Sequence, residues 1–271
     1  MHSIELKDIG LQYDQQLILN NINLEITAGD FICLIGPSGS GKSSLLRLIA
    51  GLSTPTTGDI YIDSKKITGP GLDRGVVFQE YSLFPWMSIG DNIVLGLEQA
   101  FPNKSKKALK ELAIEYLNLV ELPDVFDKLP SQLSGGMRQR AAIARSFSMD
   151  PPILLMDEPF GALDAVTRAH LQDLVSVLWK QRNNQQKTIV FVTHDVDEAL
   201  LLANKIVVLS LNPGMIKEIV PVDFFKRQNR ENLYQNKDFI DLRTKLLSLL
   251  NAQVMHQLNI GQLVPGDGSN I

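Results

Sequence analysis

The chain has 271 residues, of which 44% are hydrophobic and 21% charged, which is ordinary for a globular protein with one large α/β domain or two small ones. Its net charge of −4 argues against nucleic acid as a partner, and its single cysteine, Cys33, excludes an internal disulfide. No apolar run approaches the ~20 residues of a spanning helix. The N-terminus lacks a signal-peptide pattern. We therefore expect any link to a membrane to go through a partner.

In chain order, the hydrophobic pattern predicts strands that alternate with helices. Strands are expected at residues 4–11, 22–26, 31–35, 59–62, 75–79, 153–156, 188–192 and 206–209. Helices are expected at residues 44–50, 88–97, 105–120, 137–149, 165–181, 195–203 and 238–250, with a disordered tail at 261–271. This alternation implies an α/β fold with a mostly parallel sheet and helices on both of its faces.

The segment between the buried strand at 31–35 and the next helix has the G-x-x-x-x-G-K-S pattern of a P-loop. Its residues are Gly36, Pro37, Ser38, Gly39, Ser40, Gly41, Lys42 and Ser43, and Ser44 continues into the helix. The N–H groups of such a loop and the positive end of the helix dipole attract anions. Lys42 can reach the β- and γ-phosphates of a nucleotide, and the Ser43 hydroxyl can bind Mg²⁺. A chance Gly/Ser-rich turn is disfavoured because both flanking elements are present.

Two carboxylates, Asp157 and Glu158, follow the buried strand at 153–156. The carboxyl end of a strand is where ligands bind in open α/β sheets. There Asp157 can hold Mg²⁺, and Glu158 can act as the general base for an attacking water. A carboxylate pair that merely ends a strand is the alternative, but the P-loop in the same chain favours a nucleotide site.

A second anion-binding helix start is suggested by Ser134, Gly135 and Gly136, which open the helix at 137–149. On these three residues alone, a plain capped helix is the better interpretation. One chain thus carries two such helix starts but only one P-loop. Head-to-tail pairing of two chains would place the second site of each chain against the nucleotide of the other, in a two-fold dimer.

Together, the motifs resemble those of the ATP-binding subunits of ABC transporters over about residues 4–220. The P-loop matches the Walker A motif, and residues 153–158 match Walker B with its catalytic glutamate. Residues 133–137 match the ABC signature, and residues 162–164, which include Asp164, match the D-loop. Gln79 matches the Q-loop glutamine, and His194 matches the switch histidine. Met137 departs from the glutamine that usually ends the signature. From its position alone, Tyr13 is predicted to be an ordinary aromatic residue of a strand. The resemblance, however, implies that it stacks on adenine, because this family has an aromatic ring at that place.

The resemblance implies an ATPase with ATP and Mg²⁺ as its ligands. It assigns phosphate binding to Lys42 and the loop amides, Mg²⁺ to Ser43, Gln79 and Asp157, water activation to Glu158, and a γ-phosphate contact to His194. It further implies a P-loop NTPase core with an N-terminal antiparallel β subdomain and an α-helical subdomain inserted at about 85–150. The ATPase domain is expected at 1–225, and a short helical extension and tail at 226–271.

A narrower similarity links the segments 77–86, 157–164 and 193–199 to importers of nitrate, sulfonates and taurine. It implies a dimeric subunit at the cytoplasmic face of the plasma membrane, which energises import of a small anion such as nitrate, an aliphatic sulfonate or taurine. Two membrane permease subunits and an extracytoplasmic binding protein would be its partners. The segment 79–86, with Phe84, Pro85 and Trp86, is expected to dock the permease; packing within the helical subdomain is the alternative. For the whole chain, the alternative is a soluble ABC ATPase without a transport role.

Overall fold

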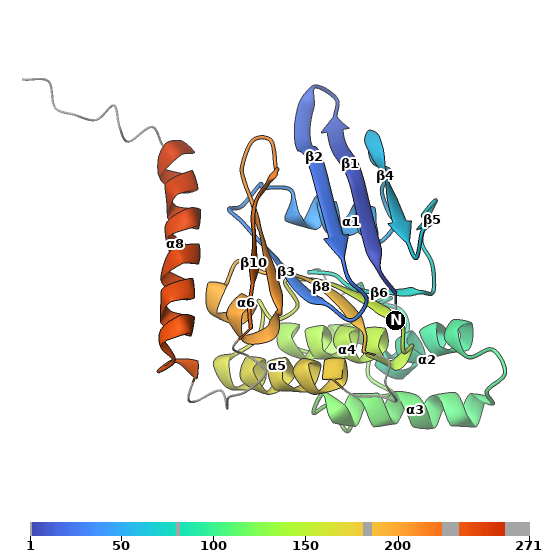
Figure 1. The fold of residues 1–271 in the computed structure, drawn as a ribbon. Helices are drawn as coiled ribbons and strands as arrows, with labels where there is room; N and C mark the ends of the chain where they lie inside the picture. The colour runs from blue at the N-terminus through green and yellow to red at the C-terminus, as the bar shows by residue number, and fades with distance from the viewer. Residues whose placement is uncertain (1, 80–81, 181–185, 224–232, 258–271) are drawn as a thin grey trace, which may run out of the picture.

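The structure is a computed structural model, and it describes residues 2–79, 82–180, 186–223 and 233–257. These residues form an antiparallel sheet, a mostly parallel sheet and the helices that pack on them (Figure 1). The predicted α/β fold, with a P-loop between a strand and a helix and an antiparallel sheet at the N-terminus, is confirmed. The tail predicted at 261–271 lies outside the described residues.

The N-terminal part of the chain forms a four-stranded antiparallel sheet in the order β2-β1-β4-β5. Its strands are β1 (Ile4–Tyr13), β2 (Gln16–Ile26), β4 (Thr57–Ile62) and β5 (Lys65–Lys66). In β1, the buried Ile4 and Leu6 alternate with more exposed neighbours, so one face of the sheet packs on the core. Strand β5 was not predicted, because two exposed lysines carry no hydrophobic pattern.

The second sheet has six strands in the order β10-β9-β3-β8-β7-β6. They are β3 (Phe31–Ile35), β6 (Arg74–Val77), β7 (Ile153–Asp157), β8 (Thr188–Val192), β9 (Lys205–Leu209) and β10 (Ile216–Pro221). All neighbouring pairs are parallel except β10 with β9 at one edge. Strand β10 was not predicted. The strand predicted at 75–79 ends at Val77, so Gln79 lies in the loop beyond it.

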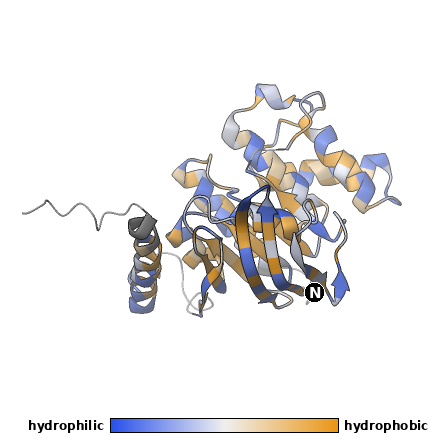
Figure 2. Ribbon diagram, turned by 90° about the horizontal axis from the view of Figure 1, so that it is seen from above, coloured by the Kyte–Doolittle hydropathy of each residue, from blue (hydrophilic) through white to orange (hydrophobic). Residues whose placement is uncertain are grey.

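Adjacent residues of the central strands face two separate cores, because side chains alternate along a strand. Leu155 of β7 packs under the antiparallel sheet together with apolar residues of helix α1 (Lys42–Ile49). Leu154 and Met156 pack with the helices on the other face. Helix α1 is thus enclosed between the two sheets (Figure 1). Because both faces of the parallel sheet are covered, its central strands are apolar at nearly every position, as the orange ribbons of Figure 2 show.

Most of the remaining helices cover the other face of the parallel sheet. They are α2 (Ile89–Ala100), α3 (Lys106–Leu119), α4 (Gly135–Ser148), α5 (Ala165–Lys180) and α6 (Val196–Leu202), with a 3-10 turn at Pro130–Gln132. Side-chain caps fix where several of them begin; for example, the Ser88 hydroxyl accepts a hydrogen bond from the N–H of Asp91. Helices α2, α3 and α4 lie together at one end of the molecule (Figure 1).

The C-terminal helix α8 (Lys237–Gln257) lies beside α6 and β10 (Figure 1). Phe239 and Leu246 of α8 are buried in the larger core, and ion pairs join Arg243 to Asp197 of α6 and Lys245 to Glu218 of β10. The helix continues beyond the predicted 238–250, because the sequence has no glycine or proline before Gly261. Among the residues that the structure describes, none of the helices has the length and apolar character to cross a bilayer.

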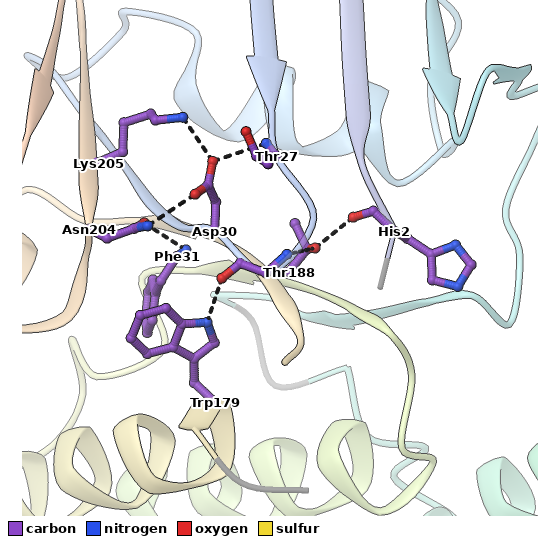
Figure 3. Close-up of polar contacts among 9 residues, drawn as sticks. His2, Thr27, Asp30, Phe31, Trp179, Thr188, Asn204 and Lys205 are labelled. Carbon is purple, nitrogen blue, oxygen red and sulfur yellow. Dashed lines mark hydrogen bonds and ion pairs between the residues drawn. The ribbon is translucent and has the colours of Figure 1, made fainter. Parts of the chain in front are cut away.

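A polar network around Asp30 ties together the amino-terminal ends of β3 and β9 (Figure 3). The Asp30 carboxylate accepts hydrogen bonds from the Thr27 N–H at 3.0 Å, the Asn204 amide at 3.0 Å and the Lys205 ammonium at 2.8 Å. Partial burial raises the pKa of Asp30, but these three donors outweigh burial and leave the pKa below its usual value. Nearby, the Trp179 indole donates to the Gly29 carbonyl at 3.1 Å, which fixes the end of α5 to the same region (Figure 3).

We predict that Asp30→Asn lowers the free energy of unfolding by about 2 kcal/mol at neutral pH, because the Lys205 ammonium loses its charged acceptor. The lowered pKa means that the carboxylate contributes fully above its unfolded-state pKa, about 3.9, and that this contribution is lost as the pH falls through the folded-state pKa. Urea unfolding of both proteins from pH 7 to pH 3 measures the difference. A difference that stays constant down to pH 3 would contradict this assignment.

Candidate active site

Three loops meet at one edge of the parallel sheet, where the predicted P-loop, carboxylates and histidine come together. The P-loop follows β3, Asp157 and Glu158 lie at the end of β7, and His194 follows β8 by two residues. Strand β8 pairs in parallel with both β3 and β7, so the carboxyl ends of all three strands open on the same side. This edge is the usual ligand site of an open α/β sheet.

The P-loop adopts a backbone that requires glycine at two of its positions. Gly39 has φ 83° and Gly41 has φ 85°, a region that other residues rarely adopt. A Cβ atom on Gly41 would also lie 2.6 Å from Cδ2 of Leu19, which belongs to β2. Helix α1 begins directly after Gly41, so the free N–H groups of its first turn face the loop. Sequence and fold thus produce a concave cluster of donors suited to an anion.

Lys42 is only 8% exposed, and its ammonium group points back to the loop. It donates hydrogen bonds to the carbonyl oxygens of Gly36 at 2.9 Å and Pro37 at 3.0 Å. Burial lowers the pKa of Lys42, while the carboxylates of Glu158 and Asp157 act in the opposite direction. Two neutral carbonyls are weak partners for a buried cation, so phosphate oxygens would be far better acceptors at this position.

Ser43 and Asp157 form the direct link between the P-loop and the second half of the site. The Ser43 hydroxyl donates a hydrogen bond of 2.9 Å to Oδ1 of Asp157, whose side chain is buried. Burial raises the pKa of Asp157, and Glu158 adds to this effect, whereas the bond from Ser43 and the charges of Arg47 and Lys42 oppose it. A hydroxyl and a carboxylate oxygen are hard donors of the kind that Mg²⁺ prefers, so these two residues fit a magnesium ion.

Glu158 and His194 lie side by side at the rim of this site. The imidazole Nδ1 of His194 is 3.4 Å from Oε2 of Glu158. Glu158 has an unusual φ of 45°, and its N–H donates to the Val192 carbonyl at 3.0 Å, which holds the backbone against β8. The His194 side chain is 70% exposed and the Glu158 side chain 24%. A carboxylate in this position is accessible to a water molecule, as a general base must be.

A cavity of about 570 Å³ opens between these loops, within the usual size range of ligand pockets. It is lined by Gln16, Ile18, Ser38, Gly39, Gly41, Lys42, Ser43, Ser44, Gln79, Glu158 and His194. Nine of the eighteen predicted site residues therefore share one cavity. Gln16 and Ile18 were missed, because they lie on β2 and reach the P-loop only through the folding of the antiparallel sheet.

Tyr13 does not line this cavity. It ends β1, is 50% exposed, and pairs in the sheet with Gln16, which does line the cavity. Tyr13 therefore lies next to the cavity rim, because its partner across the sheet is part of the lining. The stacking of Tyr13 on an adenine ring stays a prediction.

The second predicted anion site lies away from the cavity. The Ser134 hydroxyl caps α4 by accepting a hydrogen bond of 3.3 Å from the N–H of Met137. Gly136 lies against the D-loop, since a Cβ atom there would be 3.3 Å from Cδ2 of Leu163. Asp164 caps α5, with Oδ1 accepting hydrogen bonds from the N–H groups of Val166 and Thr167. The two segments are therefore neighbours, but within one chain they do not line the cavity.

The family described as ABC transporter matches residues 19–161. A putative ATP-binding protein of Brucella abortus is 46% identical over 220 residues, which make up 81% of this chain and 83% of that protein. The nitrate import ATP-binding protein NrtD of Synechococcus elongatus is 43% identical over 239 residues, or 88% and 86% of the two chains.

Among solved structures, the ATP-binding cassette MJ0796, in a dimeric post-hydrolysis state bound to ADP and Pi, is 34% identical. It matches with a TM-score of 0.74 over 82% of this chain and 100% of its own. Fold and site thus define a P-loop ATPase. The chain belongs to the ABC transporter family, as an ATP-binding subunit that hydrolyses ATP.

We predict that Lys42→Ala weakens ATP binding by about 100-fold, or about 2.7 kcal/mol, because the phosphates lose their main side-chain cation. The folded state should not lose stability, since the change also removes a buried charge whose pKa burial has lowered. Titration with ATP and thermal unfolding measure the two effects separately. Lys65→Ala, at an exposed lysine of β5, is the control and should leave both unchanged. Wild-type ATP affinity in Lys42→Ala would overturn the assignment.

Proposed function

We propose that the chain is the ATP-hydrolysing subunit of an importer for a small anion, such as nitrate, an aliphatic sulfonate or taurine. The observation that carries the proposal is the cavity in which the P-loop, Glu158 and His194 meet. The 43% identity with a nitrate import ATP-binding protein supports the importer branch and a small anion as cargo. In such an importer, the permease and the binding protein select the transported anion, and this chain supplies the free energy of ATP hydrolysis.

In this proposal, the P-loop amides, Ser44 and the Lys42 ammonium hold the phosphates of ATP. Bound Mg²⁺, held by Ser43, Asp157 and Gln79, would neutralise charge on the phosphate oxygens. Glu158 accepts the proton of the attacking water, and the neighbouring His194 contacts the γ-phosphate. The 3.4 Å contact between Glu158 and His194 supports their action on the same reacting group. The Tyr13 ring stacks on the adenine.

We further propose a head-to-tail dimer in which each chain completes the nucleotide site of its partner. Ser134, Gly135, Gly136 and Asp164 would contact the nucleotide that is held by the P-loop of the second chain. Three observations support this arrangement. The four residues lie outside the cavity of their own chain, the signature lies against the D-loop, and the similar cassette of known structure is a dimer.

The remaining assignments concern partners and organisation. Two permease subunits would bind this dimer at the cytoplasmic face of the plasma membrane, with a binding protein delivering the anion from the other side. The ATPase domain would span residues 1–225 and include the helical subdomain at about 85–150. The chain from 226 onward would form a short helical extension and tail, of which α8 is the described helix. The packing of α2, α3 and α4 on one another supports the helical subdomain.

The surface proposed for the permease centres on Phe84 and Trp86, whose ring centroids are 5.5 Å apart. Trp86 is 74% exposed, so packing within the helical subdomain does not account for its side chain. The backbone beside it is nevertheless held firmly: the N–H of Phe84 donates to Oδ1 of the buried Asn92 at 2.7 Å, and the Phe84 carbonyl accepts from Nδ2 of Asn92 at 3.1 Å. An exposed aromatic ring on a fixed backbone is a typical anchor of a protein interface.

We predict that Trp86→Ala leaves the ATP affinity of the isolated subunit unchanged and impairs assembly with the permease. Loss of such an anchor weakens association by about 2 kcal/mol, or about 30-fold. The measurement is paired: ATP binding by the free subunit, and anion uptake in cells or proteoliposomes.

Tyr234→Ala is a matched control, because Tyr234 is also an exposed ring that packs against a phenylalanine, edge to face, with 5.3 Å between the centroids of Tyr234 and Phe239. It should leave uptake unchanged. If Trp86→Ala lowers ATP affinity while uptake per bound ATP stays intact, Trp86 belongs to the nucleotide site and the docking surface lies elsewhere. If Trp86→Ala changes neither ATP affinity nor uptake, Trp86 is not part of the permease contact, and the transport proposal loses its contact surface.

A further inference from the structure

A buried polar cluster lies beside the loop that carries His194, and the proposed function gives none of its side chains a role. Its centre is Glu198, in the first turn of α6, which is only 6% exposed. Oε1 of Glu198 accepts a hydrogen bond of 2.8 Å from the side-chain amide of Gln172 on α5. Thr193, which directly follows β8, lies close enough for its hydroxyl to lower the pKa of the same carboxyl group. Gln172 and Thr193 are buried as well.

A buried carboxyl group is unfavourable unless donors compensate it. Burial raises the pKa of Glu198, whereas the hydrogen bonds from Thr193 and Gln172 lower it and the charge of Asp195 raises it further. Within α6 the carboxyl group is flanked by residues of the hydrophobic core, such as Val196 and Ala199. Its acceptor oxygens satisfy the buried amide of Gln172, so the carboxyl group holds the polar groups around it in place.

The cluster reaches the active site through the backbone on either side of His194. Oγ1 of Thr193 accepts a hydrogen bond of 3.0 Å from the N–H of Asp195, which spans His194. The N–H of Thr193 donates to the carbonyl of Leu34 in β3, at 3.3 Å. Oδ1 of Asp195 in turn accepts hydrogen bonds from the N–H groups of Asp197 and Glu198. His194 thus sits in a short loop that is fixed on both sides by the residues around Glu198.

The His194 side chain itself is exposed and meets Glu158 at the cavity rim. Its position therefore depends mainly on the backbone that carries it. If the loop shifts, the imidazole moves relative to Glu158 and the reacting phosphate. Displacements of about 1 Å can lower a rate by about 100-fold when groups must be aligned for reaction. The P-loop, which would bind most of the nucleotide, is held by other contacts.

We propose that Glu198 is a positioning residue that holds His194 in its catalytic orientation through Thr193. The inference rests on the role proposed for His194 in ATP hydrolysis. It requires that changes at Glu198 lower the rate of the chemical step and leave ATP binding nearly intact, because the P-loop is not disturbed. It also requires that a side chain of similar shape that can still accept hydrogen bonds restores the function.

The test compares Glu198→Leu, which removes the acceptor of Gln172 and the polar neighbour of Thr193, with Glu198→Gln, which retains an acceptor. The steady-state rate of ATP hydrolysis is measured with the full chain and Mg²⁺, per folded molecule. We expect kcat to fall at least tenfold in Glu198→Leu, with KM for ATP within threefold of wild type, and to remain within threefold of wild type in Glu198→Gln. The imidazole signals of His194, assigned by comparison with His194→Ala among the four histidines of the chain, should shift in Glu198→Leu alone.

Leu171→Ala is the matched control, because Leu171 is buried on α5 next to Gln172 and makes only apolar contacts with its side chain. It should lower the unfolding temperature and leave kcat and the His194 signals unchanged. If Glu198→Leu does not fold, Thr193→Val takes its place, with the same expected loss of kcat and a retained KM. A kcat equal to that of Leu171→Ala in whichever variant folds would overturn the inference.

The outcome for His194→Ala separates this inference from the proposed function. If His194→Ala hydrolyses ATP at the wild-type rate, the proposed catalytic role of His194 fails, and the positioning role fails with it. If His194→Ala is inactive while Glu198→Leu and Thr193→Val keep the wild-type kcat, the proposed function stands and only the positioning role is wrong.

Discussion

The hydrogen bond from the Ser43 hydroxyl to the Asp157 carboxylate joins two segments that are 114 residues apart in the sequence. It forms because β3 and β7 run parallel on either side of β8, so that their carboxyl ends open on the same edge of the sheet. The same topology brings His194, which follows β8, beside Glu158. The arrangement of the whole site therefore depends on one constraint, the shared direction of three central strands.

This constraint explains why so much of the fold could be predicted from the sequence. A strand covered on both faces must be apolar at nearly every position, so β3, β7 and β8 appear in the sequence as short continuous apolar runs. The P-loop, the carboxylate pair and His194 each come directly after such a run. Their meeting at one edge follows once the strands are parallel, and the cavity that they line agrees with that expectation.

Features that depend on long-range packing could not be predicted in this way. Ile18 lines the cavity because β2 is hydrogen-bonded to Gly214 near β10, at 2.9 Å, and no local pattern reports that contact. Glu198 reads in the sequence as one of two acidic residues that favour the start of a helix, and only the packing of α5 on α6 shows that it is buried. The phosphate contacts of Ser134 and Asp164 stay predictions, because they require a second chain.

The proposed dimer requires that each ATP is held by the P-loop of one chain and the signature of another. The most direct measurement mixes Lys42→Ala chains with Ser134→Arg chains, both carrying Glu158→Gln to prevent turnover, and determines the ATP retained by the protein. Each variant alone has two damaged sites per dimer, whereas a mixed dimer has one intact site. If each site is shared between two chains, the mixture retains clearly more ATP than either variant alone. Retention equal to the mean of the two separate variants would show that each chain holds its ATP without the signature of the other.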